Sequence, residues 1–278
     1  MVDMDIFFNY RLENGIYRNP RIVHAGQEKE AVFRRSVAAR HHENYLESIT
    51  RHHSVPVMTR EVERFLRGLP KNAVVVDVGG CWGWHWRNLS LHRPDVVVAI
   101  VDFVAENLDH ARAILGDQVG RNIYLCVDNA CALGFPDAAF DGYWTVQCFQ
   151  HIPAWGQAIT EAHRILKPRG RFVDHTLNRQ KLVELISTAL GKPYVLEGQT
   201  QSYYLSRDIA AIEAEIERVF GQPVSRRYSD VLFDIGVRTG FNAGRDGSML
   251  GAIDALLTEI GGLFAPIARQ VGLEVVKA

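Results

Sequence analysis

Between residues 73 and 175, short apolar runs alternate with stretches of helical spacing. The apolar runs are rich in β-branched and aromatic residues, which is typical of strands buried on both faces of a parallel sheet. Strands are predicted over 73–78, 96–101, 123–127, 140–147 and 171–175. Helices are predicted between them over 83–91, 104–115 and 154–166. This alternation predicts an α/β fold with a doubly wound, mostly parallel sheet and right-handed crossovers.

The chain before this alternation is less regular. Residues 1–26 show little periodicity and predict an irregular arm. Helical spacing then predicts one helix over 28–50 and a second over 59–69, with Thr59 as its N-cap and Gly68 near its end. We therefore expect an N-terminal arm and helical cap over residues 1–70.

The chain after residue 176 mixes patterns. Helices are predicted over 179–190, 206–220 with Ser206 as cap, and 249–271 with breaks at Gly261-Gly262 and Pro266. A strand or hairpin arm is predicted over 224–237, a loop over 238–248 and a last strand over 273–277. We expect one main domain over 71–278, with a substrate-lid insertion over about 177–270.

Composition and charge narrow the function classes. The 278 residues are 47% hydrophobic and 23% charged, ordinary for a soluble enzyme, and carry a net charge of −1. We therefore expect no nucleic-acid partner and no membrane partner, since both favour a basic surface and the apolar runs are too short to span a bilayer. The acidic N-terminus and four cysteines without metal-ligand spacing indicate a cytoplasmic, reduced protein. A homodimer stays open.

The most informative local pattern is a glycine-rich turn after the first predicted strand. Asp77 precedes Gly79, Gly80 and Gly83, and such a turn lets backbone approach a ligand closely. The next predicted strand ends at Asp102, about 20 residues beyond the glycines, where a carboxylate suits the hydroxyls of a ribose. The two features predict a ligand that contains adenosine.

The spacing of the glycines narrows the choice of ligand. A dinucleotide site needs G-x-G-x-x-G, but counting from Gly79 this chain has Cys81 and Trp84 at the second and third glycine positions. The P-loop pattern is also absent. A nucleotide-dependent oxidoreductase is therefore disfavoured, and an adenosine without phosphates, such as S-adenosylmethionine, is favoured.

Five segments in order extend the pattern. They are Asp77-Val78-Gly79-Gly80-Cys81-Trp82-Gly83, Val101-Asp102-Phe103, 128–141, 147–152 and 162–172. Through them residues 70–176 resemble the class I S-adenosylmethionine-dependent methyltransferases, whose first motif is D-x-G-x-G-x-G. Cys81 stands where that motif has its middle glycine.

The resemblance implies roles at the turn and at the end of the second strand. Gly79 and Gly83, with Gly80, would shape the turn under the methionine part of the cofactor. Asp77 would orient the turn or the cofactor amine. Asp102 would accept hydrogen bonds from the ribose hydroxyls; its alternative is a solvated acid at a strand end.

Further roles follow from the later motifs. The resemblance implies that Phe103 lies against adenine and that Asp128 accepts from the adenine amino group, with backbone of Asn129 and Ala130 beside it. Asp128 has the same alternative as Asp102, a solvated strand-end acid. Gln147, at the end of the fourth predicted strand, would line the site near the transferred methyl.

His151 is the candidate catalytic residue. It follows the fourth predicted strand, at the carboxyl edge where ligands bind, and a histidine can accept a proton near neutral pH. The alternative is a helix cap or a backbone hydrogen bond. A base is not required in every enzyme of this fold, because the sulfonium is an activated methyl donor and positioning alone supplies much of the rate.

Histidines also gather near the N-terminus. Five of the eleven fall between His24 and His53, including two adjacent pairs. Adjacent histidines point to different sides of a helix, so we expect a solvated or substrate-facing segment and no metal.

The motifs and the resemblance together predict a methyltransferase that uses S-adenosylmethionine, leaves S-adenosylhomocysteine, and acts on O, N or C of a small-molecule acceptor. Its alternative is a protein of the same fold that binds the cofactor without transferase activity.

Overall fold

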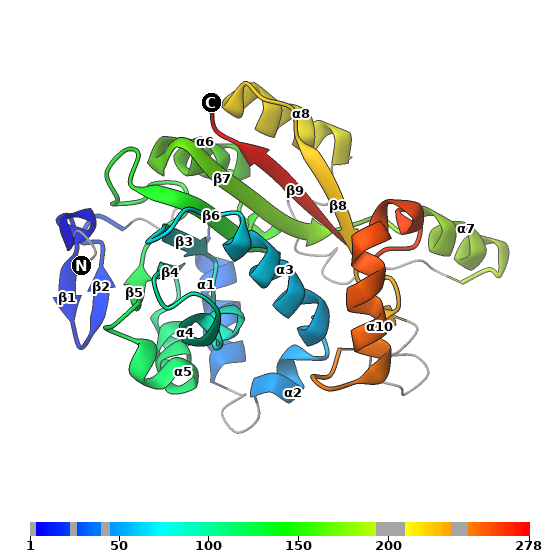
Figure 1. The fold of residues 1–278 in the computed structure, drawn as a ribbon, viewed down its shortest axis with the longest axis horizontal. Helices are drawn as coiled ribbons and strands as arrows, with labels where there is room; N and C mark the ends of the chain where they lie inside the picture. Colours follow the sequence, from blue (N-terminus) through cyan, green and yellow to red (C-terminus); the bar gives the residue numbers. More distant parts are fainter. Residues whose placement is uncertain (1–3, 23–26, 40–44, 193–208, 235–243) are drawn as a thin grey trace.

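One mixed sheet organises the chain. The computed structural model describes residues 4–22, 27–39, 45–192, 209–234 and 244–278. Within these residues the strands are β1 (Arg11–Glu13), β2 (Ile16–Arg18), β3 (Val74–Val78), β4 (Val97–Asp102), β5 (Ile123–Val127), β6 (Phe140–Val146), β7 (Leu166–Leu177), β8 (Ser225–Ser229) and β9 (Gln270–Val276). Their order is β1-β2-β5-β4-β3-β6-β7-β9-β8, parallel from β2 to β7 and antiparallel at both edges (Figure 1). The predicted mostly parallel α/β sheet is confirmed.

Helices cover both faces of this sheet. The α-helices are α1 (Glu28–Ala38), α2 (Tyr45–Ile49), α3 (Val55–Arg67), α4 (Leu89–His92), α5 (Ala105–Leu115), α6 (Trp155–Ile165), α7 (Lys181–Ala189), α8 (Ile209–Phe220) and α10 (Met249–Leu257). Short 3-10 turns are η1 (Met4–Phe7), η2 (Trp84–Trp86), η3 (Gly116–Gln118), η4 (Phe149–His151) and η6 (Thr258–Phe264). Helices α6 and α8 pack on one face, and α3, α4 and α5 on the other (Figure 1).

Strand residues alternate between two hydrophobic clusters, as a pleated strand requires. On β3, Val76 and Val78 belong to the cluster under α6 and α8, whereas Val75 belongs to the cluster under α3 and α5. On β4, Val101 and Ile100 divide in the same way. The continuous apolar runs in the sequence therefore reflect burial on both faces.

The N-terminal arm is not irregular. Strands β1 and β2 form a hairpin whose second strand pairs in parallel with β5, with Tyr17 opposite Cys126. The turn residues Asn14 and Gly15 have φ of 50° and 76°. Positive φ at both central positions is the requirement of a two-residue hairpin turn, and Asn-Gly is its strongest sequence signal. The irregular-arm prediction is wrong because this short-range signal outweighs the missing periodicity.

Several other boundaries also differ from the predictions. The helix expected over 28–50 is split into α1 and α2, and residues 40–44 between them lie outside the described residues. Thr59 is interior to α3, where its hydroxyl donates to the carbonyl of Val55, and Ser54 is the N-cap because Pro56 suits the first helical turn. Gly68 is the C-cap of α3, as predicted.

The helix expected over 83–91 is the 3-10 turn η2 followed by α4. The helix expected over 249–271 is α10 and η6, after which β9 begins at Gln270. Ser206, residues 238–243 and most of the segment before α8 lie outside the described residues. The two-part division at residue 70 and the lid insertion stay predictions.

Candidate active site

A cavity of about 540 Å³ opens at the carboxyl edge of β3, β4, β5 and β6. This is the edge at which open α/β sheets bind ligands, and the size lies within the roughly 300–1,000 Å³ of small-molecule sites. We call the strand-end residues the sheet-edge wall; it contains Gly79, Gly80, Cys81, Asp102, Phe103, Asp128, Asn129, Ala130, Gln147 and Cys148. We call the opposite residues, from α1 and the end of α2, the outer wall; it contains Glu30, Phe33, Arg34, Val37, Ile49, His52 and His53.

The glycine turn has no room for larger residues. Gly79 has a φ of +75°, and a Cβ added there would lie 2.4 Å from the Sγ of Cys148. The N–H groups of Gly79 and Gly80 donate to the carbonyl of Val101, which ties the turn to β4. Cys81 itself has a φ of +50°, a conformation in which glycine is unstrained. The missing family glycine thus leaves the turn geometry intact at a cost in backbone strain.

Asp77 and Gly83 support the turn from behind and do not line the cavity. The buried carboxylate of Asp77 accepts from Nε1 of Trp86 at 2.6 Å, and burial raises the pKa of Asp77 to about 7. A Cβ on Gly83 would lie 2.8 Å from side chains of Ile100 and Leu115. Both residues therefore position the turn through packing and hydrogen bonding inside the protein.

Asp102 lies at the cavity with part of its acceptor capacity unused. Its Oδ1 accepts from the N–H of Val104 at 2.8 Å and from the amide of Asn107 at 3.3 Å, while Oδ2 accepts from the N–H of Cys81 at 3.1 Å. A carboxylate has about four lone-pair positions, so a further donor can be accepted on Oδ2. Burial raises the pKa of Asp102 to about 6. A hydroxyl donor at this place would favour its ionised form.

Asp128 does something different from the predicted adenine contact. Its Oδ1 accepts from Asn19 and from the N–H of Asn129, and its Oδ2 accepts from the hydroxyl of Tyr10 and the N–H of Gly134. All of its lone-pair positions are in use, so none remains for an adenine amino group. Asp128 instead anchors the N-terminal hairpin to the end of β5.

Phe103, Asn129, Ala130 and Gln147 all line the cavity, and the cofactor contacts expected of them stay predictions. The Oδ1 of Asn129 accepts from the N–H of Cys131, which shapes the loop after β5. Gln147 has a φ of 48°, and its buried Nε2 has no hydrogen-bond partner among the described residues. An unsatisfied buried donor is costly, so a ligand acceptor at this point would be stabilised.

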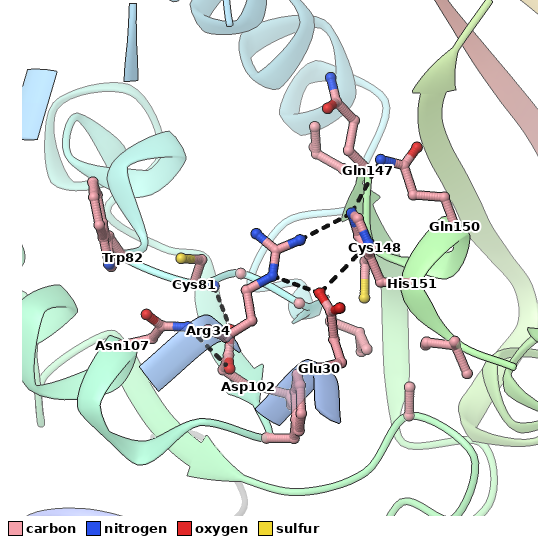
Figure 2. A pocket seen from close by; sticks show the side chains of 18 of the residues that line it. Glu30, Arg34, Cys81, Trp82, Asp102, Asn107, Gln147, Cys148, Gln150 and His151 are labelled. Atoms are coloured by element: carbon pink, nitrogen blue, oxygen red, sulfur yellow. Dashed lines mark hydrogen bonds and ion pairs between the residues drawn. The ribbon is translucent and has the colours of Figure 1, made fainter. Parts of the chain in front are cut away.

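His151 meets two residues of the outer wall that sequence reasoning missed. Its Nε2 accepts from Arg34 at 3.0 Å and from Gln150 at 3.1 Å, and its Nδ1 lies 3.5 Å from Glu30 (Figure 2). Arg34 also donates to Glu30 at 2.7 Å. The i,i+4 spacing of Glu30 and Arg34 was the available signal, but it does not reveal the partner across the cavity.

In the ligand-free protein the contacts of His151 are those of neither a free base nor a helix cap, and its catalytic role stays a prediction. Burial, and then the charge of Arg34, lower the pKa of His151 to about 3, and the Nε2 lone pair is already bonded. The ring is therefore neutral and is not free to act as a base. The ring does not cap α6 either, because the N-cap is Ala154.

Histidines and one arginine gather at the far end of the cavity. The rings of His53 and Trp84 lie 6.0 Å apart, those of Trp84 and His85 lie 4.1 Å apart, and Arg269 donates to the carbonyl of His52. Burial lowers the pKa of His85 well below its usual range. This end of the cavity is aromatic and holds the neutral imidazole of His85. His52 and His53 line it, and a substrate-facing role for them stays a prediction.

The described residues contain neither a metal-binding cluster nor a membrane-spanning helix. Among them, no group of three or more His, Cys, Asp and Glu side chains is arranged to hold a metal ion. No helix in those same stretches is long and apolar enough to cross a membrane. His24, His41 and His42 lie outside the described residues.

The chain is similar in sequence to known methyltransferases. Residues 76–174 match the family model described as a methyltransferase domain. The chain is 33% identical over 95 residues to the ubiquinone/menaquinone biosynthesis C-methyltransferase UbiE of Methylobacterium nodulans, covering 34% of this chain and 38% of that protein. It is 28% identical over 117 residues to UbiE of Rickettsia akari, covering 40% and 47%. The chain thus spans less than half the length of the curated relatives it matches.

Solved structures share the fold at low identity. A structure of the Haloferax volcanii Trm112 methyltransferase activator in complex with a methyltransferase matches with a TM-score of 0.60 and 18% identity over 87% of this chain and 97% of that one. Phosphoethanolamine N-methyltransferase 2 of Haemonchus contortus matches with a TM-score of 0.53 and 17% identity over 78% and 52%. The [4+2]-cyclase SpnF matches with a TM-score of 0.50 and 15% identity over 91% and 94%.

The fold and the sheet-edge wall define an α/β domain with a cavity of ligand size at a topological switch point, the place where open α/β sheets bind their ligands. The match to the family model narrows the class of protein. The chain carries a class I S-adenosylmethionine-dependent methyltransferase domain, and S-adenosylmethionine is the cofactor of that family.

Proposed function

We propose that this chain is an S-adenosylmethionine-dependent methyltransferase that acts on a small-molecule acceptor. One observation carries the proposal: the carboxylate of Asp102 and the turn from Gly79 to Cys81 lie side by side on one cavity wall, joined by the hydrogen bond from the N–H of Cys81 to Oδ2. A carboxylate that keeps an unused lone pair beside exposed backbone suits a ribose joined to a short polar chain.

The residues present fit the cofactor. Asp102 would hold the ribose hydroxyls, while Phe103, Asn129 and Ala130 would lie beside the adenine. Gly79, Gly80 and Cys81 would lie under the amino-acid part, supported from behind by Asp77 and Gly83. When bound, the cofactor supplies an electrophilic methyl group on a sulfonium. The protein's part is then to exclude water and to position the acceptor.

The acceptor would occupy the histidine end of the cavity. Its aromatic walls and the neutral imidazole of His85 favour an uncharged or partly aromatic small molecule with a group that can hydrogen-bond. The net charge of −1 disfavours nucleic acid. The relatives named as C-methyltransferases support carbon as the methylated atom, and the structural neighbour named as an N-methyltransferase supports nitrogen. Oxygen is the third candidate for the methylated atom, on chemical grounds alone.

The proposal also covers the partners of this protein and its location in the cell. The neighbour solved with the Trm112 activator makes a protein partner a candidate beside the homodimer. A cytoplasmic location remains our prediction from composition.

Denaturing the purified protein and identifying released small molecules by mass spectrometry tests cofactor identity. Calorimetry should give tighter binding of S-adenosylmethionine and S-adenosylhomocysteine than of NAD, because Cys81 and Trp84 crowd a pyrophosphate. Tighter binding of NAD would refute the proposal.

A cofactor-binding protein without transferase activity is the second candidate. It is favoured by the occupied Nε2 of His151, because this ring is not free to act as a base in the ligand-free protein. The neighbour named as a cyclase supports it as well. Cofactor binding with no turnover across hydroxyl, amine and aromatic-carbon acceptors would favour this candidate.

A further inference from the structure

A short polar bridge connects the two walls of the cavity. Arg34, on α1 of the outer wall, donates through Nη2 to His151 and through Nε to Glu30. His151 follows β6. Among the described residues, its Nε2 also accepts from the uncharged amide of Gln150, and its Nδ1 lies 3.5 Å from Glu30. The arginine side chain is 33% exposed, and its guanidinium carbon also lies 5.7 Å from the centre of the Phe33 ring.

The charge of Arg34 acts directly on the sheet-edge wall. It lowers the pKa values of Asp102, Cys81 and Cys148 against the effect of their burial. In Figure 2 its guanidinium lies between Cys81 on one side and Glu30 and His151 on the other. Arg269, the other arginine that lines the cavity, lies instead beside His52 and within 3.7 Å of Asp230 and Asp234. Of the two arginines that line the cavity, Arg34 is therefore the one whose charge acts on Cys81 of the glycine turn.

We propose that Arg34 is the cavity residue that binds the carboxylate of an amino-acid-bearing adenosine ligand, and that by turning to this carboxylate it releases Nε2 of His151. This inference rests on the proposed function and assigns a residue and a coupling to it. A guanidinium binds a carboxylate more strongly than a neutral imidazole, because both partners of the new contact are charged. The exchange of partners is therefore favourable once a ligand carboxylate is in reach.

The release changes what His151 can do. With Arg34 bound to His151, Nε2 is an acceptor and the ring proton is on Nδ1, facing Glu30. When Arg34 has turned to the ligand carboxylate, Nε2 keeps only the bond from the uncharged amide of Gln150, while Glu30 still favours a proton on Nδ1. The two charged groups that face the ring are then Glu30 and Arg34, and the ligand carboxylate balances the charge of Arg34. The proton affinity of His151 therefore rises. Ligand binding on one wall thereby prepares a proton acceptor for the other.

A comparison of two ligands tests the carboxylate contact. S-adenosylhomocysteine carries the carboxylate, whereas 5′-methylthioadenosine has the same adenosine and sulfur without it. Arg34→Gln should weaken binding of S-adenosylhomocysteine by about 10- to 100-fold and leave 5′-methylthioadenosine within about 2-fold. Arg35→Gln, an exposed neighbour on the same helix, is the matched control and should change neither.

The coupling is tested by NMR of the histidine ring nitrogens. In ligand-free protein burial and the charge of Arg34 hold the pKa of His151 at about 3, so the ring should not titrate between pH 5 and 8. With S-adenosylhomocysteine the pKa should rise by the share that Arg34 contributes, while burial keeps it below the usual value of histidine. With 5′-methylthioadenosine the pKa should stay where it is in the ligand-free protein. His151→Gln assigns the signal.

The outcomes separate the inference from the proposed function. If both ligands bind and Arg34→Gln weakens them equally or not at all, the inference is overturned and the proposed function stands. A pKa of His151 that is the same in the S-adenosylhomocysteine complex and in the ligand-free protein overturns the coupling. If neither adenosine ligand binds the wild-type protein, the proposed function falls, and the inference with it.

Discussion

The two walls of the cavity are built from the chain in different ways. The sheet-edge wall comes from residues 78–148, where successive parallel strands deliver their carboxyl ends to one edge. The outer wall comes from α1 and the end of α2, and residues as distant as Arg269 complete the cavity. The first wall is fixed by backbone hydrogen bonds and close glycine packing. The second is held by side-chain contacts such as those of Arg34, so it is the wall in which partners can exchange.

Removing His151 should have the largest effect, because it is the point where the walls meet. If the released Nε2 accepts a proton from the acceptor, His151→Ala should lower turnover by about 10²–10⁴-fold with nearly unchanged cofactor affinity. The loss should shrink as the pH rises, since the acceptor then ionises without help. Steady-state kinetics across pH with the identified acceptor checks this.

His92→Ala is the control, since this half-exposed histidine of α4 lies away from the cavity. Normal turnover of His151→Ala at every pH would remove the residue from the chemistry and would leave positioning as its role.

The rigidity of the sheet-edge wall is tested at Gly79. A methyl group there meets Cys148 and also adopts a positive φ, so Gly79→Ala should reduce the free energy of unfolding by about 2–5 kcal/mol. Gly120 has a φ of +84° and nothing within 4 Å, so Gly120→Ala should cost about 1–2 kcal/mol from the backbone alone. Urea denaturation of both variants gives the difference. Equal losses would mean that the turn yields to the added methyl.

The tie between the N-terminal hairpin and β5 is tested at Tyr10. Its hydroxyl donates to the buried Asp128, so Tyr10→Phe should cost about 1.5–3 kcal/mol of stability. Cofactor affinity should fall only slightly, because Asp128 would not touch the ligand. Tyr124→Phe is the matched control, since its hydroxyl makes only an exposed 3.4 Å contact. A large loss of affinity with no loss of stability would restore the predicted adenine contact.

The smallest effect is a pH dependence of binding. The pKa of Asp102 is raised to about 6, above its usual value, so the ligand-free fold favours the protonated acid. This contribution to stability is present below about pH 4 and is lost as the pH rises towards 6. A ribose that donates to the ionised form reverses the preference. S-adenosylhomocysteine should therefore bind about tenfold more weakly at pH 5 than its plateau above pH 7.

Calorimetry at several pH values measures this dependence. Asp102→Asn should bind more weakly, by about 1–3 kcal/mol, with a flatter pH profile. A wild-type profile that matches the variant would remove Asp102 from the ligand contacts.

Much of the fold was open to sequence reasoning because its signals are local. Apolar runs of β-branched residues gave five strands, and the positions of Gly79 and Asp102 at strand ends followed from them. The hairpin at Asn14-Gly15 was missed although its turn signal was present. Its pairing with β5 joins residues more than 100 positions apart, which no local pattern records.

The sequence by itself determined which residues could form the sheet-edge wall, since strand ends and turn glycines depend on backbone rules that act over a few residues. Tertiary structure decided what the side chains there bind. Only the folded chain shows that Asp128 is satisfied by Tyr10 and Asn19, and that Arg34 reaches His151 across the cavity. The physical reason is that a carboxylate or imidazole has few hydrogen-bonding positions, and any donor the fold brings near can fill them.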